Sequence, residues 1–401
     1  TALHLILIIG KKRQRYGRVD LETTMNEIIY PLAKETINTE DIDALCDWLK
    51  TYPRLTKGAV TVEVEGKWAS YIGTKHAVFN NSGSSANLLM IYAALMTGRI
   101  KNKKIVVPSV GWVTPIAPAI QFGLEPIMVG ADPDTFGIDL DQLEAVCERE
   151  RPDAVIFVQV LGVPHYKERL LKLKEKYGFC LLEDACAALG AAYGDGSMVG
   201  TVGDMSSFSF YFGHQLSTIE GGMVNTDDKE LYDALLMLRS HGWAKDLDQA
   251  AYDTLIRDHG VDDFHKPFTF FVPGFNLRST DLQAFVGLRQ GDKAIWVSQR
   301  RNENHVAYAE FLEGYVDYQK WGDNVPVSIS FGALADNGCQ RQVCEAPDWP
   351  RTGRRRGMCR RCGGQRDRVP ARPGPGDGGS GNRRERRRIR LRPRAFCGRE
   401  G

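Results

Sequence analysis

Residues 154–184 read AVIFVQVLGVPHYKERLLKLKEKYGFCLLED, and this stretch determines the fold class. It begins with the apolar run Ala154–Val158 and closes with a second one, Phe179–Leu182, before two acidic residues. Between these runs, Glu168–Tyr177 has the spacing of an amphipathic helix. A strand, a helix and a second apolar strand indicate two parallel strands joined by a crossover helix.

The same alternation continues on both sides of this unit. Further apolar runs occupy Lys104–Val107 and Pro126–Val129, and a further amphipathic stretch covers Leu140–Cys147. The pattern predicts an α/β fold with a mostly parallel sheet and helices on both faces. Such sheets bind ligands at the carboxyl ends of their strands.

The pattern also suggests domain limits. We expect a large α/β domain over residues 25–289 and the start of a smaller C-terminal domain over residues 290–335. Residues 1–24 show no clear period and do not begin with methionine, so we interpret them as an N-terminal extension outside the fold.

Composition is that of an ordinary globular protein, with 43% apolar and 25% charged residues in a chain of 401. No stretch approaches the ~20 apolar residues of a membrane span. The apolar residues 2–9 precede their basic cluster, whereas a secretory signal has the charges first. Nine irregularly spaced cysteines form no disulfide framework. We therefore expect a soluble, cytoplasmic protein.

Charge divides the chain into two parts. Residues 1–335 contain 33 Lys and Arg against 43 Asp and Glu, which disfavours nucleic-acid binding by this part. Residues 336–401 contain 19 Arg, no Lys and 7 acidic residues without an apolar period, which is typical of disorder. This tail has three interpretations: an RNA-binding arm, a zinc site at Cys359 and Cys362, or translation in a shifted reading frame. The abrupt Arg, Gly and Pro composition favours the third.

Two polar segments adjoin predicted strands and helices. Asn81-Ser-Gly-Ser-Ser-Ala-Asn87 precedes the apolar helix Leu88–Leu95, so Ser84 and Ser85 lie at a helix N-terminus, where an anion is favoured. Glu183-Asp184 follows an apolar strand, where a carboxylate faces the ligand cleft. Each segment has an ordinary alternative, which is capping of the next helix or turn.

A third segment runs from Gly203 to Val224. It contains Ser209-Phe-Tyr-Phe-Gly-His214, a turn between two short apolar runs, and the pair Gly221-Gly222. A lone histidine in such a place is more often structural than catalytic, so this segment alone decides no function.

Together and in this order, the three segments resemble the DegT/DnrJ/StrS family of pyridoxal-phosphate (PLP) sugar-nucleotide aminotransferases. The resemblance covers about residues 28–335 and includes Pro108-Ser-Val-Gly-Trp112, Arg239-Ser-His-Gly-Trp243 and Gly274-Phe-Asn-Leu-Arg278. It implies the fold-type I architecture of PLP-dependent transferases. It also implies a homodimer whose cofactor sites are shared between subunits.

Residue by residue, the resemblance implies a cofactor site and a substrate contact. The glycine and serines would hold the phosphate, the tryptophan would stack on the pyridine ring, and the aspartate would pair with the protonated ring nitrogen. Asn276 and Arg278 would reach the phosphate bound by the partner subunit, and His241 is expected to bind substrate. The predicted cofactor-binding residues are Gly83, Ser84, Ser85, Trp112, Asp184, Ser209, Asn276 and Arg278.

His214 is the main departure from the family pattern. Most members have, five residues after the serine that corresponds to Ser209, a lysine that binds the cofactor covalently. Because an imidazole cannot do so, the cofactor would be held non-covalently as pyridoxamine phosphate (PMP). This variant resembles the 3-dehydratases of the family, which act on nucleotide-linked 4-keto-6-deoxyhexoses in the synthesis of 3,6-dideoxy sugars for lipopolysaccharide O-antigen.

The expected catalytic residues are His214 and Asp184. His214 would take a proton from carbon C4′ of the cofactor and protonate the departing C3 hydroxyl. Asp184 would stabilise the charge that the ring accepts. The cysteines at 46, 147, 180 and 186 form no tight cluster, which favours glutamate as the amino donor over an iron–sulfur cluster and its reductase.

Two smaller departures leave other functions open. Ala187 stands where relatives have Gln, Glu or His, and residues 336–401 do not resemble the small domain that follows a strand, expected here at Val327–Phe331. The alternatives are a sugar-nucleotide aminotransferase, a catalytically inactive family member and an RNA-associated protein.

Overall fold

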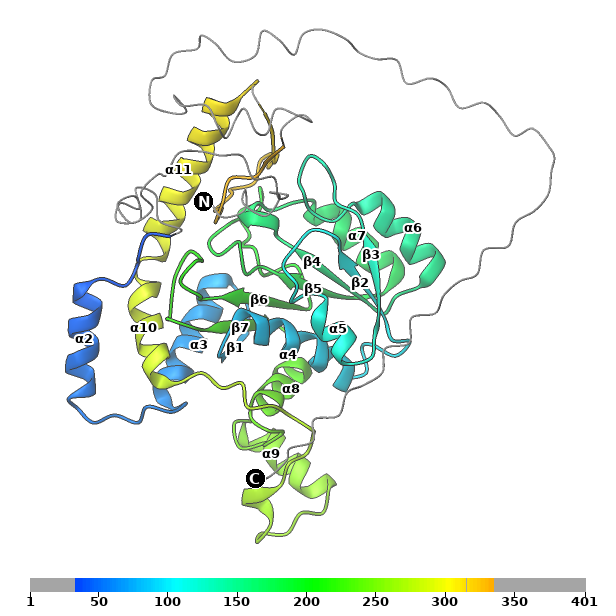
Figure 1. Ribbon diagram of the computed structural model, residues 1–401. Helices are drawn as coiled ribbons and strands as arrows, with labels where there is room; N and C mark the ends of the chain where they lie inside the picture. Colours follow the sequence, from blue (N-terminus) through cyan, green and yellow to red (C-terminus); the bar gives the residue numbers. More distant parts are fainter. Residues whose placement is uncertain (1–32, 315, 335–401) are drawn as a thin grey trace, which may run out of the picture. The chain divides into compact units, whose positions relative to one another are not determined.

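A computed structural model of the chain describes residues 33–314 and 316–334. The centre of this part is a seven-stranded sheet with the order β1-β7-β6-β5-β4-β2-β3 (Figure 1). The expected N-terminal extension, 1–24, and the arginine-rich tail, 336–401, lie outside the described residues.

The sheet is mostly parallel, as the sequence predicts. Neighbours from β3 to β6 run parallel, whereas β7 is antiparallel to both β6 and β1. The single antiparallel strand therefore separates β1 from the parallel block. The strands are β1 (His76–Asn80), β2 (Lys104–Pro108), β3 (Glu125–Val129), β4 (Ala154–Val158), β5 (Cys180–Asp184), β6 (Met205–Ser209) and β7 (Gly222–Thr226).

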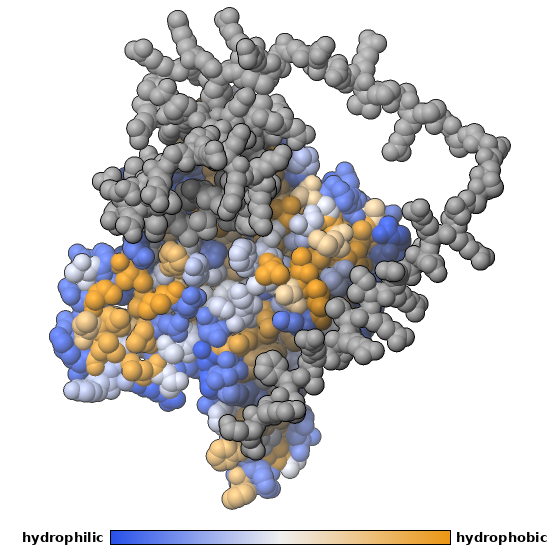
Figure 2. All heavy atoms as spheres, in the orientation of Figure 1, coloured by the Kyte–Doolittle hydropathy of each residue, from blue (hydrophilic) through white to orange (hydrophobic). Residues whose placement is uncertain are grey.

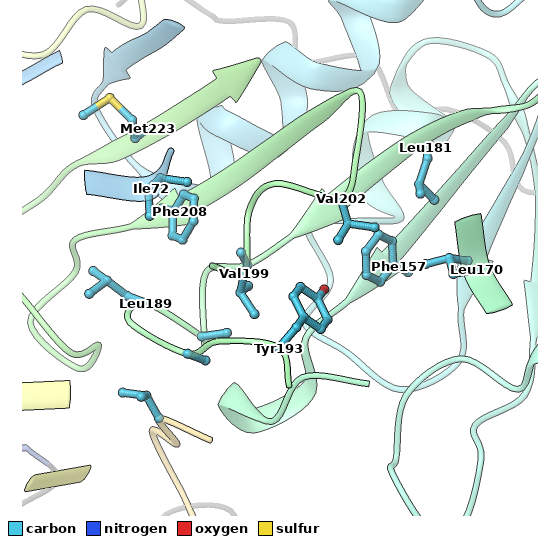
Figure 3. Close-up of a cluster of buried hydrophobic side chains, with 14 of the residues drawn as sticks. Ile72, Phe157, Leu170, Leu181, Leu189, Tyr193, Val199, Val202, Phe208 and Met223 are labelled. Atoms are coloured by element: carbon cyan, nitrogen blue, oxygen red, sulfur yellow. The ribbon is translucent and has the colours of Figure 1, made fainter. Parts of the chain in front are cut away.

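Helices cover both faces because the strands are apolar on both sides. Val155 and Phe157 of β4 belong to one buried cluster, and Ala154 and Ile156 belong to the other. Figure 3 shows part of the first cluster, with Phe157 and Phe208 among its members. The helices of this first face are α3 (Ala59–Ile72), α6 (Leu140–Glu150), α7 (Lys167–Tyr177), α10 (Asp281–Gly291) and α11 (Ala294–Leu312).

The opposite face is covered by α4 (Gly83–Met96), α5 (Ala117–Gln121) and α8 (Lys229–Arg239). α4 crosses the sheet next to β6 and β7 and buries Leu89, Met90 and Ile91 completely, so its sequence is apolar on nearly every side. The other helices of the described residues are α2 (Thr39–Leu49), α9 (Gln249–Asp258) and the short η2 (Val160–Gly162) and η3 (Lys266–Phe268). Among the helices described, none has the length and apolarity to cross a membrane.

One predicted element is wrong. Val327–Phe331 forms no strand; the only strands described after α11 are β8 (Asp317–Tyr318) and β9 (Ala333–Leu334), which pair antiparallel. Instead, the N–H groups of Val327 and Ile329 donate to the carbonyls of Gly162 and Leu161, at 3.0 and 3.1 Å. The segment thus lies against η2 by isolated main-chain bonds rather than as a sheet strand.

The N-terminus of α3 is capped from a distant part of the chain. Its N-cap residue, Gly58, has no side chain to supply an acceptor. The buried carboxylate of Asp281, the first residue of α10, takes that role. It accepts from the main-chain N–H groups of Gly58 and Thr61, at 2.7 and 3.0 Å, and from the Thr61 hydroxyl at 2.6 Å.

We predict that Asp281→Ala lowers the free energy of unfolding by about 1–3 kcal/mol, because it leaves buried N–H donors without an acceptor. Denaturant unfolding of the full chain measures the change. Asp292→Ala, at the exposed C-terminal end of the same helix, is the matched control and should have little effect. Equal stability of Asp281→Ala and the parent protein would contradict the capping role.

Candidate active site

Three of the segments singled out in the sequence meet at one edge of the sheet. β1, β5 and β6 run in the same direction, so Asn80, Asp184 and Ser209 end their strands at this edge. β7 starts there, with Gly222 paired to both Asn80 and Ser209. A Cβ atom on Gly222 would lie 2.2 Å from the carbonyl oxygen of Ser82, so this close approach requires glycine.

The N-terminus of α4 packs directly on Ser209. A Cβ atom on Gly83 would lie 2.5 Å from Cβ of Ser209, and the Ser209 side chain is 6% exposed. Ser82 is the N-cap residue, and its Oγ accepts from the N–H of Ser85 at 3.1 Å. Ser84 is exposed and Ser85 is half-buried. The first turn of α4 therefore faces Ser209 with N–H groups that lack intrahelical partners.

Asp184 is a buried carboxylate at the end of β5, with 4% of its surface exposed. Its Oδ2 accepts from Asn87 Nδ2 at 2.8 Å, and its Oδ1 accepts from the N–H of Cys186 at 3.0 Å. Burial raises the pKa of Asp184, and these hydrogen bonds oppose the rise only in part. Within the described residues no Lys or Arg side chain forms an ion pair with it. The site thus holds a desolvated acid that lacks a cation.

Asn87 has no predicted role, yet its side chain hydrogen-bonds to three other residues of the site, Thr114, Asp184 and Ser207. Its Nδ2 also donates to Thr114 Oγ1 at 3.1 Å, and its Oδ1 accepts from the Ser207 hydroxyl at 2.7 Å. Sequence signals for this network exist. Asn87 is four residues after Gly83 and so lies on the same side of α4, and Ser207 shares a strand face with Ser209.

Glu183 belongs to a different environment, although it is adjacent to Asp184 in sequence. Because successive strand residues alternate in direction, its fully buried carboxylate lies on the opposite face. There Oε1 accepts from Gln159 Nε2 at 2.7 Å and from the Tyr193 hydroxyl at 3.2 Å, and Oε2 accepts from the N–H of Val202 at 3.1 Å. We interpret Glu183 as an internal support of the sheet edge.

His214 lies on the turn after β6. Its Nδ1 is buried and has no hydrogen-bond partner in the described part of the chain. Burial, and then the charge of Arg301, lower the pKa of His214 to about 4. The imidazole is therefore neutral at physiological pH, with one ring nitrogen unsatisfied inside the protein.

The remaining predicted residues form a second group beside β1. Arg278 pairs with Asn80 through an isolated bridge, and its Nη2 lies 3.4 Å from Nε2 of His241. Asn276 is exposed and bridges to Ser240. The structure thus brings Asn276, Arg278 and His241 together at the outer side of β1, whereas Gly83, Asp184 and Ser209 gather around the ends of β5 and β6.

Trp112 stands on the loop after β2 and is 68% exposed. A Cβ atom on the preceding Gly111 would lie 3.3 Å from Val158, the last residue of β4. The same loop carries Thr114, which binds Asn87. The loop therefore lies over the carboxyl ends of the strands, with the indole accessible.

The family model described as the DegT/DnrJ/EryC1/StrS aminotransferase family matches residues 35–325. The chain belongs to this family. A GDP-4-keto-6-deoxy-D-mannose 3-dehydratase from Yersinia pseudotuberculosis is 34% identical over 298 residues, which are 73% of this chain and 75% of that protein.

Solved structures of family members have the same fold. The E. coli GDP-4-keto-6-deoxy-D-mannose-3-dehydratase with bound hydrated PLP matches with a TM-score of 0.71 and 30% identity, over 79% of this chain and 82% of that one. A GDP-4-keto-6-deoxymannose-3-dehydratase with a trapped PLP-glutamate geminal diamine matches with a TM-score of 0.69, 30% identity and the same coverage. The sheet described above is therefore that of fold-type I PLP-dependent transferases.

The residues present fit a phosphorylated pyridine cofactor of this family. A helix N-terminus next to a serine hydroxyl suits a phosphate. The buried carboxylate of Asp184 lacks the cation that a protonated pyridine nitrogen would be. The unpartnered Nδ1 of His214 marks a further polar group that the protein itself does not satisfy.

We predict that Asp184→Asn changes how stability depends on pH. Because burial raises the pKa of Asp184 above its ordinary value of 3.8, the folded state binds more protons than the unfolded state as pH rises from about 4. The parent protein should therefore lose stability relative to Asp184→Asn over this range. Denaturant unfolding of the cofactor-free protein between pH 4 and 8 measures the difference.

Asp43→Asn, on the exposed side of α2, is the control for loss of a carboxylate at the surface. It should follow the parent protein at every pH. A constant difference between Asp184→Asn and the parent protein across the range would show that Asp184 titrates normally.

Proposed function

We propose that this chain is a PMP/PLP-dependent nucleotide-sugar 3-dehydratase, which removes the C3 hydroxyl of a GDP-linked 4-keto-6-deoxyhexose with glutamate as amino donor. The observation that carries the proposal is His214. It occupies the position, five residues after Ser209, at which an aminotransferase of the family needs a lysine, and the relatives named above are 3-dehydratases. Those relatives include the protein whose PLP is trapped with glutamate.

The cofactor would be held by groups from four segments. The N-terminus of α4, with Gly83, Ser84 and Ser85, and the Ser209 hydroxyl would bind its phosphate. Asp184 would pair with the ring nitrogen, and Trp112 would cover the ring. When bound, the cofactor would act as an electron sink, because its pyridine ring accepts electrons when a bond near the carbon attached to its amine is broken.

In the proposed reaction Asp184 would be negatively charged, whereas His214 would start as a neutral base. A carboxylate beside the ring nitrogen favours the protonated ring, and the ring cation in turn reverses the effect of burial on Asp184. His214 starts as a neutral imidazole because burial and Arg301 disfavour its charge. It can therefore accept a proton and then donate it to the C3 oxygen as that oxygen leaves as water.

A homodimer would complete the site. The exposed Asn276 and the neighbouring Arg278 lie at the outer side of β1, where they could reach a phosphate held by the partner subunit. Figure 2 shows hydrophobic side chains gathered over α2 and α10, and Ile42 of α2 is 47% exposed. An apolar surface of this kind is typical of an interface between subunits.

We predict that the chain, given PMP, glutamate and a GDP-linked 4-keto-6-deoxyhexose, releases a 3-deoxy sugar. His214→Asn should keep cofactor affinity and lower turnover by ~10²–10⁴-fold, the usual contribution of a general acid–base. His259→Asn, at the exposed C-terminal end of α9, is the control and should leave turnover unchanged. Mass spectrometry of the products identifies the sugar that is released and measures the turnover of both variants.

Other results assign other functions. A 4-amino sugar as the only product would identify an aminotransferase. Cofactor binding without any turnover would identify an inactive member of the family.

We further predict that Gly83→Ala weakens binding of PMP by at least about tenfold, or ~1.4 kcal/mol. The added methyl group would lie 2.5 Å from Cβ of Ser209, so the start of α4 must move away from the proposed phosphate site. Equilibrium dialysis measures the affinity. Gly66→Ala, in the middle of α3 with open space around its Cβ position, is the matched control. Unchanged affinity in Gly83→Ala would place the phosphate elsewhere.

A further inference from the structure

Arg301, on α11, contacts both the turn of His214 and a segment that returns to the sheet after β8. We call residues 325–329 the return segment. Arg301 Nη1 donates to the carbonyl of Ser328 at 3.1 Å, and Nη2 donates to the carbonyl of His214 at 3.4 Å. One guanidinium therefore joins two pieces of main chain that are more than a hundred residues apart.

The return segment is held from both sides. One turn further along α11, His305 Nδ1 lies 2.9 Å from the Ser328 hydroxyl, and Asn302 Nδ2 donates to the carbonyl of Pro326 at 2.9 Å. On the other side, Gln215 Nε2 donates to the carbonyls of Val327 and Ala187, at 2.8 and 2.6 Å. Gln215 directly follows His214, so both residues of this turn are tied to the return segment or to α11.

The return segment packs closely against the main chain beside it. A Cβ atom on Gly162 would lie 2.4 Å from the Val327 carbonyl oxygen, and Gly162 has a φ of +91°. The segment lies in contact with the η2 main chain, which itself follows β4. The His214 turn is therefore bonded to a segment that is itself closely packed and hydrogen-bonded to η2.

Within the described residues, no carboxylate forms an ion pair with Arg301. Both hydrogen bonds of its side chain in the described part of the chain end on neutral carbonyls, and the side chain is half-buried. Arg301 is also the only charged group of the described residues that shifts the pKa of His214. Tyr211, on the same turn, is a titratable neighbour of the imidazole, and its ring centroid is 6.3 Å away.

We infer that Arg301 is a positioning residue for His214, which fixes the turn that carries the imidazole and places a positive charge near the ring. This inference rests on the proposed function for its catalytic meaning, because a base must start unprotonated. The geometric and electrostatic part concerns the protein alone and can be tested without turnover.

The first test is a titration of the imidazole of His214 by NMR in the full-length, cofactor-free protein, with His214→Asn used to assign the signal. We expect the parent imidazole to titrate near pH 4, far below the ordinary value of 6.5. A midpoint near 6.5 in the parent protein would overturn the inference without any Arg301 variant.

Two substitutions separate the charge from the hydrogen bonds. Arg301→Gln keeps a donor but removes the charge, so the His214 midpoint should rise by roughly one pH unit. Arg301→Lys keeps the charge, so the midpoint should stay within a few tenths of a unit of the parent value. Arg300→Gln is the matched control, because Arg300 is exposed on the same helix and pairs with Glu303 at 2.7 Å.

The pH dependence of kcat/KM gives the second readout. Its acidic limb should move upward with the His214 midpoint in Arg301→Gln and remain in place in Arg300→Gln. An unchanged midpoint and unchanged acidic limb in Arg301→Gln, together with reduced stability, would show that Arg301 has only a structural role. If no variant and no parent protein turns over substrate while the NMR shift occurs, the proposed function fails and the influence of Arg301 on His214 stands.

Discussion

The site depends on one constraint, which is the burial of the Asp184 carboxylate at the end of β5 without a cation beside it. A buried carboxylate must be hydrogen-bonded, and Asn87 and the N–H of Cys186 meet that demand. Asn87 can do so only because α4 begins at Gly83, close against Ser209. Through Asn87, the Ser207 hydroxyl and the loop with Thr114 join the same hydrogen-bond network as this acid. Its remaining electrostatic need is the cation that the cofactor ring would provide.

Local patterns in the sequence predict the parts of this arrangement that depend on local physics. The apolar run 154–158 is β4 with the same bounds, and the stretch 168–177 is α7 with one residue added at its start. The sequence predicts Asp184 just after a strand, and in the structure it is the last residue of β5. Contacts between distant segments leave no such pattern. The antiparallel strand β7 needs glycine at position 222, because a Cβ atom there would lie too close to the main chain of Ser82, and the return segment needs Gly162 for the same reason. The sequence pattern therefore predicts neither the direction of β7 nor the path of the return segment.

Burial acts on Asp184 and His214 in the same physical way and with opposite chemical results. It favours the neutral form of each group, so it raises the pKa of the acid and lowers that of the imidazole. A cofactor cation would restore the charge of Asp184, whereas Arg301 reinforces the neutrality of His214. A lysine at position 214 would carry a charge or bind the cofactor covalently. A neutral histidine does neither, which is consistent with the proton-transfer role proposed for it.

The contacts of α11 connect this helix and residues 325–329 to the candidate site. The pairing of β6 with β7 fixes the two ends of the turn after Ser209, and the N–H of Phe210 continues it by donating to the carbonyl of Gly221 at 2.9 Å. Arg301 on one side and the Gln215–Val327 hydrogen bond on the other hold the part of the turn around His214. Helix α11 and residues 325–329 therefore support the turn of the candidate site. The boundary predicted after residue 289 from sequence pattern alone falls inside α10 and would separate His214 from two of the interactions that hold its turn.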